Sequence, residues 1–206
     1  MPLQNRVDPF GNLIRTGARG TIMGNRGGAL HHADREIVRA YKSRRWIACV
    51  LEFRGRHRIV MSPNRYTELF FLDEATAFAA GHRPCAECRR ERYKAFKDAW
   101  QLARRLDEPP FADEMDLEMH NARIDRGKKI TYEAALGSLP DGCFIQVEGD
   151  AYLMLGDAML LWTPEGYARR EARPADSIAT VLTPKPIVEC FRQGYRAEIH
   201  ESGRLP

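Results

Sequence analysis

The sequence predicts an α+β fold in two units, residues 1–108 and residues 109–206. Helical periodicity and a strand–turn–strand pattern occupy the first part, whereas short apolar runs of period two follow one another from residue 139 onward. Between the two patterns, Asp107-Glu108-Pro109-Pro110 stops a helix and coincides with a change in the sign of the charge. We therefore expect a β-hairpin with helices in the first unit and a β-meander with a helix in the second.

The first unit is expected to begin with an arm rich in glycine, arginine and asparagine that has no periodicity up to Gly28. Apolar residues at helical spacing then predict a helix over residues 34–45. Apolar and aromatic runs predict strands over residues 46–53, 57–61 and 66–72. The turn Arg54-Gly55-Arg56 joins the first two strands into a hairpin.

Two helices are expected in the remainder of the first unit. Asp73 is a favourable N-cap for a short helix over residues 74–80, which Gly81 ends. Residues 91–106 place aromatic side chains on one face and basic side chains on the other, which is typical of a helix with one buried face.

The second unit is expected to be richer in strands. Residues 113–125 predict an acidic helix, and a further helix is expected to begin at Thr131. Alternating apolar residues predict strands over residues 144–147, 152–155, 159–162 and 177–182. Pro184 then opens a helix that Gly194 ends.

Composition excludes several classes of protein. The hydrophobic content of 44% and charged content of 29% are those of an ordinary globular protein, and no apolar run approaches the ~20 residues that span a bilayer. The first residues are polar and do not form a secretory signal. Five cysteines in a chain of 206 residues without a signal do not indicate a disulfide framework. We therefore expect a protein of the reducing cytoplasm.

The charge is distributed unevenly along the chain. Residues 1–108 carry 21 lysines and arginines against 12 aspartates and glutamates, whereas residues 109–206 carry 11 against 16. The net charges are therefore +9 and −5, and 18 of the 21 basic residues in the first part are arginine. The arginine fork suits phosphate, which favours DNA or RNA as a partner. The alternative is an arginine-rich composition whose charges lie on a solvated face.

The most informative motif is Gly81-His82-Arg83-Pro84-Cys85-Ala86-Glu87-Cys88-Arg89-Arg90. The Cys-x-x-Cys spacing lets two sulfurs grip one tetrahedral metal ion, and the neighbouring arginines favour the thiolate form. The other ligands must come from elsewhere in the chain. A redox dithiol is disfavoured because the motif follows no βαβ pattern.

Residues 70–88 resemble the N-terminal zinc domain of Ada-type DNA methylphosphotriester repair proteins. That family has an aromatic strand, a short alanine-rich helix ending in Ala-Gly, and then an aromatic residue followed by Arg-Pro-Cys-x-x-Cys. Arg83, Pro84, Cys85 and Cys88 match that pattern, with His82 in place of the aromatic residue. The resemblance is strong over about twenty residues and implies zinc as the metal, with Cys85 and Cys88 as two of its ligands.

The other two ligands of the family come from an upstream Cys-x-x-x-Cys, which this sequence lacks. Cys49 is the only upstream cysteine, and the family's second upstream cysteine aligns close to His57. We therefore take Cys49, His57, Cys85 and Cys88 as the candidate zinc ligands. His31, His32 and His82 are alternatives for the positions other than Cys85 and Cys88.

Three functions are compatible with these observations. The first is contact with nucleic acid by a protein whose zinc is mainly structural, with phosphate contacts from Arg83, Arg89, Arg90 and Arg92. The second is a zinc-assisted enzyme, which either transfers an alkyl group from a DNA phosphotriester to Cys49 or hydrolyses a substrate with the help of His31 or His32. The third is a non-catalytic module in which zinc holds the fold and the acidic unit binds a protein.

Overall fold

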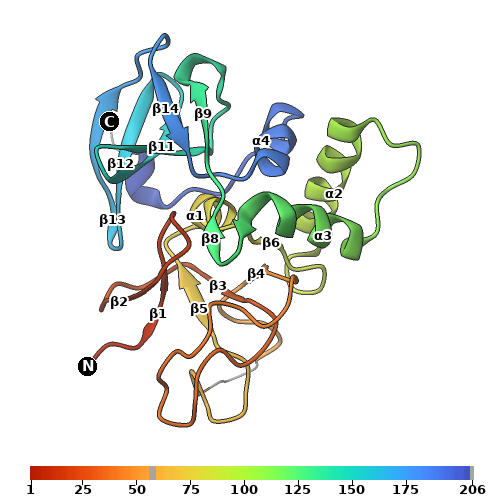
Figure 1. Cartoon of the computed structure of the whole chain (residues 1–206), viewed down its shortest axis with the longest axis vertical. Coiled ribbons are helices and arrows are strands. Elements are labelled where there is room, and N and C mark those ends of the chain that lie inside the picture. Colours follow the sequence, from red (N-terminus) through yellow and green to blue (C-terminus); the bar gives the residue numbers. More distant parts are fainter. Residues whose placement is uncertain (56–58, 205–206) are drawn as a thin grey trace.

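Two six-stranded β-sheets and four α-helices form the structure, a computed structural model that describes residues 1–55 and 59–204. One sheet belongs to the N-terminal part of the chain and the other to the C-terminal part, with helices between and beside them (Figure 1). This mixture of helices and sheets confirms the predicted α+β class. No helix among the described residues is long and apolar enough to cross a membrane.

The N-terminal sheet is assembled from short strands that lie far apart in the sequence. Its strands are β1 (Gln4–Val7), β2 (Leu13–Arg15), β3 (Ile22–Asn25), β4 (Ile47–Cys49), β5 (Leu69–Phe71) and β6 (Arg83–Pro84). Their order is β2-β1-β5-β3-β4-β6, with β1/β5 and β4/β6 parallel and the other pairs antiparallel. Because Ile47 lies opposite Arg83 in the β4/β6 pair, the carboxyl ends of these two strands meet at one edge.

The C-terminal sheet is entirely antiparallel and contains the predicted meander. Its strands are β9 (Tyr132–Ala135), β10 (Phe144–Val147), β11 (Asp150–Leu155), β12 (Ala158–Thr163), β13 (Gly166–Ala172) and β14 (Ile178–Val181). Their order is β13-β12-β11-β10-β14-β9. A small hairpin of β7 (Ile124–Asp125) and β8 (Lys128–Lys129) precedes this sheet.

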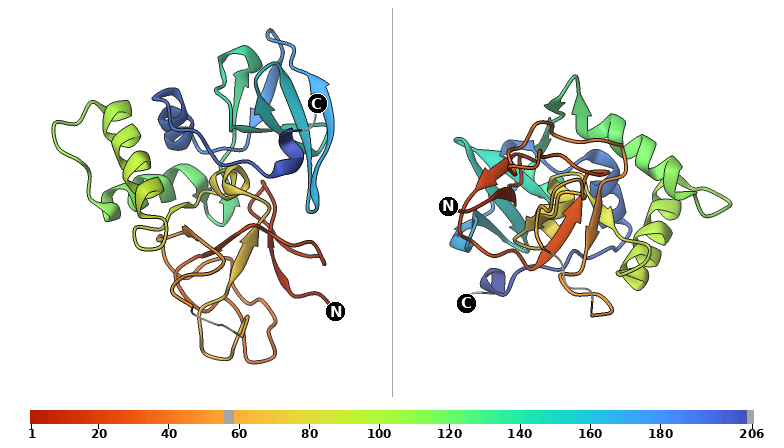
Figure 2. Two further views of the ribbon diagram at one scale, coloured as in Figure 1. Left: turned by 180° about the vertical axis from the view of Figure 1, so that it is seen from behind. Right: turned by 90° about the horizontal axis from the view of Figure 1, so that it is seen from below.

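The short helix α1 (Glu74–Ala79) lies between the two sheets, as the view from behind in Figure 2 also shows. Asp73 caps it as predicted, because its carboxylate accepts hydrogen bonds from the backbone and hydroxyl of Thr76 at 2.8 and 2.7 Å. Gly81 follows with a φ of +83°, which favours glycine at the end of a helix. Every residue of α1 is buried, so the helix forms the centre of the molecule.

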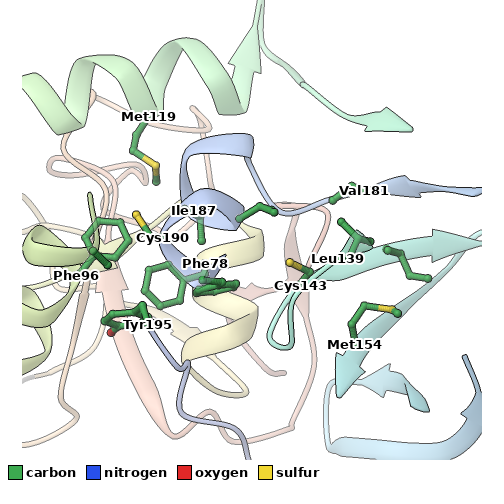
Figure 3. Close-up of a cluster of buried hydrophobic side chains, with 14 of the residues drawn as sticks. Phe78, Phe96, Met119, Leu139, Cys143, Met154, Val181, Ile187, Cys190 and Tyr195 are labelled. Atoms are coloured by element: carbon green, nitrogen blue, oxygen red, sulfur yellow. The ribbon is translucent and has the colours of Figure 1, made fainter. Parts of the chain in front are cut away.

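The other helices pack around α1 and share its core. They are α2 (Arg90–Arg104), α3 (Ala112–Arg123) and α4 (Lys185–Arg192). The rings of Phe78 of α1 and Phe96 of α2 lie close together (Figure 3). The centroid of the Phe78 ring is 5.4 Å from that of Phe96 and 5.4 Å from that of Phe191 of α4. Met119 of α3 and Met154 of β11 belong to the same buried cluster. Residues on both sides of the boundary predicted at residue 108 therefore share one core, in which a phenylalanine-to-alanine change costs about 3–5 kcal/mol.

The opposite charges of the two parts of the chain meet in ion pairs. Arg83 is buried against Asp116 at 2.8 Å, and Arg104 lies 2.6 Å from Glu118. On the surface, Arg45 pairs with Asp113 at 2.9 Å. Part of the charge asymmetry seen in the sequence is therefore neutralised inside the molecule.

Several expectations about secondary structure are wrong. The arm up to Gly28 contains β1, β2 and β3. Residues 34–45 form no helix, because their backbone N–H groups bond to distant carbonyls, as Val38 does to Leu30. Thr131 precedes strand β9 instead of opening a helix. The second strand of the predicted hairpin lies partly outside the described residues, and residues 59–61 are not a strand.

Candidate metal centre

Three cysteines from two distant segments form a cluster. The sulfur atoms of Cys49, Cys85 and Cys88 all lie within 4.8 Å of one another, and each residue is half-buried. Within residues 1–55 and 59–204, these three form the one group of histidine, cysteine and acidic side chains close enough to hold a metal ion. The predicted pair Cys85 and Cys88 is thus joined by Cys49, the predicted upstream cysteine.

The short strands β4 and β6 bring these thiols together. Cys49 is the last residue of β4. The backbone N–H of Cys85 donates to the carbonyl of Ala48 at 2.8 Å, which fixes the start of the Cys-x-x-Cys turn beside the end of β4. The carbonyl of Cys85 in turn accepts from the N–H of Arg89 at 3.2 Å, just before α2 begins. The turn is therefore held between a strand and a helix.

The spacing of the sulfurs fits a tetrahedral thiolate site. Zinc–sulfur bonds of about 2.3 Å place neighbouring sulfurs roughly 3.8 Å apart. Sulfurs within 4.8 Å of one another reach that geometry through small changes in side-chain torsion angle. Three thiolates are soft ligands, which suit zinc, copper(I) or iron better than magnesium or calcium. The cluster could therefore hold one metal ion, with a fourth position for a further ligand.

Electrostatics favour a thiolate at Cys85. A hydrogen bond from Cys49 lowers the pKa of Cys85 to about 5, and the backbone N–H groups of Glu87 and Cys88 stabilise the same sulfur. The hydrogen bond to Cys85 raises the pKa of Cys49, and burial adds to this effect. Burial also raises the pKa of Cys88. A metal cation among the three sulfurs favours deprotonation of all three.

A cavity of about 390 Å³ adjoins the thiols, and all three cysteines line it. Its other walls include apolar and aromatic side chains, among them Phe53 and Tyr66. Neither aromatic residue was predicted to belong to the site, since no motif connects them to the cysteines in the sequence. The metal position is therefore accessible from a pocket rather than enclosed by the described residues.

The histidines proposed as ligands lie elsewhere or outside the described residues. His57, the predicted fourth ligand, is not among the described residues. His31 is buried, with its Nδ1 2.6 Å from the hydroxyl of Thr67 and its Nε2 3.3 Å from the carbonyl of Ser62. His82 is buried between the rings of Trp46 and Phe71.

The metal cluster of the described chain includes none of His31, His32 and His82. His32 is exposed to solvent. Both ring nitrogens of His31 are engaged, so this residue is unsuited to the hydrolytic role considered for it.

Three of the four arginines predicted to contact phosphate are engaged inside the protein. Arg83 and Arg89 are buried, Arg83 against Asp116 and Arg89 2.9 Å from Glu74. Arg92 also pairs with Glu74. Arg90 alone of the four is exposed. The pair of Arg83 and Asp116 joins β6 to α3, and the pairs with Glu74 join the start of α2 to α1. The phosphate role of the four arginines stays a prediction.

Comparison with known proteins finds no matching family model, no similar curated protein and no similar solved structure. The resemblance to the Ada-type zinc domain therefore rests on the sequence motif. What the structure adds is the proximity of Cys49 to the Cys-x-x-Cys turn.

Proposed function

We propose that this chain is a zinc-binding protein in which Cys49, Cys85 and Cys88 hold the metal and its role is mainly structural. The observation that carries the proposal is the convergence of three thiols from segments 36 residues apart, between Cys49 and Cys85, onto one point. A tetrahedral ion at that point joins the end of β4 to the turn that begins α2. Thiolate ligands and a single small cluster favour zinc over the harder divalent cations.

The fourth ligand decides between a closed structural site and an open one. We propose His57 for this position. Phe53 lines the same cavity as the three cysteines, and His57 follows it by four residues. A Cys₃His site of this kind is closed and structural. If water occupies the fourth position instead, the site has the open form that zinc enzymes use.

Metal analysis of the purified chain tests this proposal. We expect about one zinc per chain, lost in Cys49→Ser, Cys85→Ser and Cys88→Ser but retained in Cys143→Ser, a buried cysteine outside the cluster. Cobalt(II) substitution then counts thiolates through the sulfur-to-metal charge-transfer absorption. Zinc content and thermal stability that are unchanged in Cys49→Ser would contradict the proposed ligand set.

His57→Ala separates the two forms of the site. For a Cys₃His site, we expect weaker zinc binding and a loss of thermal stability that zinc in excess restores. A cobalt spectrum and a zinc affinity equal to those of the wild type would mean that another ligand takes the fourth position.

Contact with DNA or RNA is our second proposal, supported by exposed charge in the basic half. Several arginines there are exposed and have no carboxylate within 4 Å in the described part of the chain: Arg35, Arg39, Arg44, Arg65 and Arg90. Such unpaired guanidinium groups can reach phosphates, in contrast to the buried Arg83 and Arg89.

Salt dependence of binding tests this second proposal. We expect an affinity for a short DNA or RNA duplex that falls steeply with salt concentration. The triple variant Arg44→Gln/Arg65→Gln/Arg90→Gln should reduce the slope of log K against log [salt] by about 0.9 for each lost DNA phosphate contact. No binding at low ionic strength would exclude the nucleic-acid role and leave the zinc proposal intact.

A further inference from the structure

A second cavity, of about 450 Å³, is lined by basic side chains and lies away from the cysteines. It is half-enclosed by the first residues of the chain, the segment around residues 37–40, the end of α3 and the β7–β8 hairpin. Four cationic residues contribute to its wall: Arg26, Arg39, Arg123 and Lys129. Arg26 and Arg123 are only 2% and 3% exposed, so their charges lie deep in the protein.

Among the described residues, the guanidinium group of Arg26 donates its hydrogen bonds to neutral acceptors. It donates to the carbonyl of Gly11 at 2.9 Å, to that of Ala40 at 3.4 Å and to Nε2 of His82 at 3.3 Å. It also lies 4.1 Å from the centre of the Trp46 ring. These contacts use three of the five N–H groups of an arginine, and none of them pairs its charge with a carboxylate.

Arg123 and Lys129 likewise donate hydrogen bonds to neutral carbonyl groups. Arg123 donates to the carbonyls of Gly81 at 2.8 Å and Arg44 at 2.6 Å, while its buried Nε has no hydrogen-bond partner among the described residues. The ammonium group of Lys129 donates to the carbonyl of Ala79 at 2.6 Å. None of these acceptors is charged.

Elsewhere the same chain neutralises its buried arginines. Four arginines are classed as buried in the described structure, and two of them, Arg83 and Arg89, lie against carboxylates at 2.8 and 2.9 Å. The other two are Arg26 and Arg123, which make no ion pair within 4 Å in the described part of the chain. Buried charges in proteins are normally paired, so the absence of a counter-ion here calls for a negative group from outside the chain.

Two carboxylates act on these cations, but both are engaged. Asp116 interacts electrostatically with Arg123 and is already paired with Arg83 at 2.8 Å. Asp8 accepts hydrogen bonds from the backbone and side-chain nitrogens of Asn12 at 2.8 and 3.0 Å. It interacts electrostatically with Arg26 and Lys129 without forming an ion pair within 4 Å in the described residues. With Asp116 neutralised by Arg83, the charges of Arg26, Arg123 and Lys129 are opposed by Asp8 alone, which leaves a local excess of two positive charges.

Burial disfavours the charged forms of these groups. It lowers the pKa of Arg26 and of Arg123 to about 9 each. Burial is also the main reason that the pKa of Lys129 falls to about 7, with Arg26 contributing further. Bound negative charge would raise all three pKa values again.

We propose that this cavity binds a small organic dianion and that its ligand class is the phosphate monoester. Two guanidinium groups and an ammonium group match the charge and the many acceptor oxygens of a phosphate group. The volume of about 450 Å³ is in the range of small-molecule sites. Phe10, Leu13 and Ile37 also line the cavity and supply apolar contacts for the organic part.

A polynucleotide is a poor candidate for this site. Its backbone would have to bring phosphates onto side chains that are 2% and 3% exposed, which a small molecule achieves by entering the cavity. Arg39 is exposed at the cavity and can attract an anion towards the buried cations. Arg39 is shared with the nucleic-acid contact proposed above, but the buried cations of the cavity belong to this site and do not depend on that contact.

Calorimetric titration of the metal-loaded full chain tests this inference, with inorganic phosphate and phenyl phosphate as probes in chloride buffer at constant ionic strength. We expect saturable binding of both, with phenyl phosphate the tighter. Lys129→Met should weaken phosphate at least about tenfold. Arg39→Gln, an exposed change that leaves the core intact, should weaken it a few-fold. Arg65→Gln, an exposed arginine outside the cavity, should bind as the wild type does.

Three results would overturn the inference. The first is absence of phosphate binding in the wild type. The second is unchanged affinity in both Lys129→Met and Arg39→Gln, which would place the bound phosphate elsewhere. The third is a change of ligand class. Tighter binding of succinate than of either phosphate probe would assign the cavity to a dicarboxylate, and displacement of phosphate by a short oligonucleotide would assign it to a nucleic acid.

Discussion

Replacing Asp116 by asparagine tests how the arginine beside the cysteine motif is neutralised. Arg83 and Asp116 form a two-pronged ion pair, with Nε to Oδ1 and the second nitrogen to Oδ2 both at 2.8 Å. Their side chains are only 7% and 1% exposed. Asparagine keeps the shape of aspartate but removes its charge, so the change leaves a buried guanidinium group without a counter-ion.

The expected loss in the free energy of unfolding is about 3–5 kcal/mol, the usual cost of breaking a buried ion pair by removing one partner. For a chain of 206 residues this corresponds to roughly 6–20 °C in melting temperature. Arg83→Met should cost a similar amount. The double variant Arg83→Met/Asp116→Leu should recover most of the loss, since it removes both charges and keeps the volume apolar.

Denaturant unfolding of the purified protein, followed by circular dichroism, measures these losses in the free energy of unfolding. The matched control is Arg45→Gln, which breaks the pair with Asp113 whose side chains are 64% and 54% exposed. That change should cost less than about 1 kcal/mol. If Asp116→Asn costs no more than Arg45→Gln, the buried pair does not stabilise the fold.

Three further results are expected. Gly81→Ala should lower the free energy of unfolding by about 2–4 kcal/mol, measured by thermal unfolding, because the backbone there has a φ of +83° and a Cβ would lie 2.5 Å from Cδ of Arg123. The control Gly149→Ala should cost only about 1 kcal/mol, because its φ is +96° but its Cβ would enter open space. Chelation of the metal should expose the three clustered thiols to maleimide, counted by mass spectrometry, while Cys143 reacts only after unfolding. Without phosphate, the gain in free energy of unfolding from Lys129→Met should be greatest near pH 6. The gain should shrink by about 1–3 kcal/mol by pH 9, because the pKa of the lysine is about 7 in the folded wild type and near 10.5 in the unfolded chain, so the wild type becomes more stable as the pH rises. Melting curves at the two pH values check this, with Arg26, Arg123 and Asp8 as the charged groups that face Lys129.

The parts of the fold that were predicted correctly are those specified by local chemistry. Asp73 and Gly81 define the two ends of α1 through a cap and a positive φ, both of which depend on single residues. The meander was found because short apolar runs follow one another and are separated by glycine-containing turns at residues 148–150 and 156–157. Cys49 was placed with the Cys-x-x-Cys turn through the resemblance to a known zinc domain, and the sulfur positions agree.

The parts that were missed depend on contacts between distant residues. Strands β1 to β3 are three or four residues long and pair with strands from elsewhere in the chain, so their local pattern is weak. In the segment predicted as a helix over residues 34–45, the carbonyl of Ala40 accepts a hydrogen bond from the side chain of the buried Arg26. Backbone N–H groups of the same segment donate to the carbonyls of Leu30 and Arg26. A buried arginine has no signature that distinguishes it from a solvated one in the sequence.

The two proposed sites are built on the same pair of strands. Trp46, which lies against the guanidinium groups of Arg26 and Arg123, immediately precedes β4, and Cys49 ends that strand. The parallel partner of β4 is β6. Gly81, two residues before β6, accepts a hydrogen bond from Arg123, and Cys85 directly follows β6. A metal that joins the carboxyl ends of β4 and β6 therefore also restrains their amino ends, where the buried cations are held. Because each strand is only two or three residues long, we expect a metal at the proposed thiolate site to support the geometry of the proposed anion site as well.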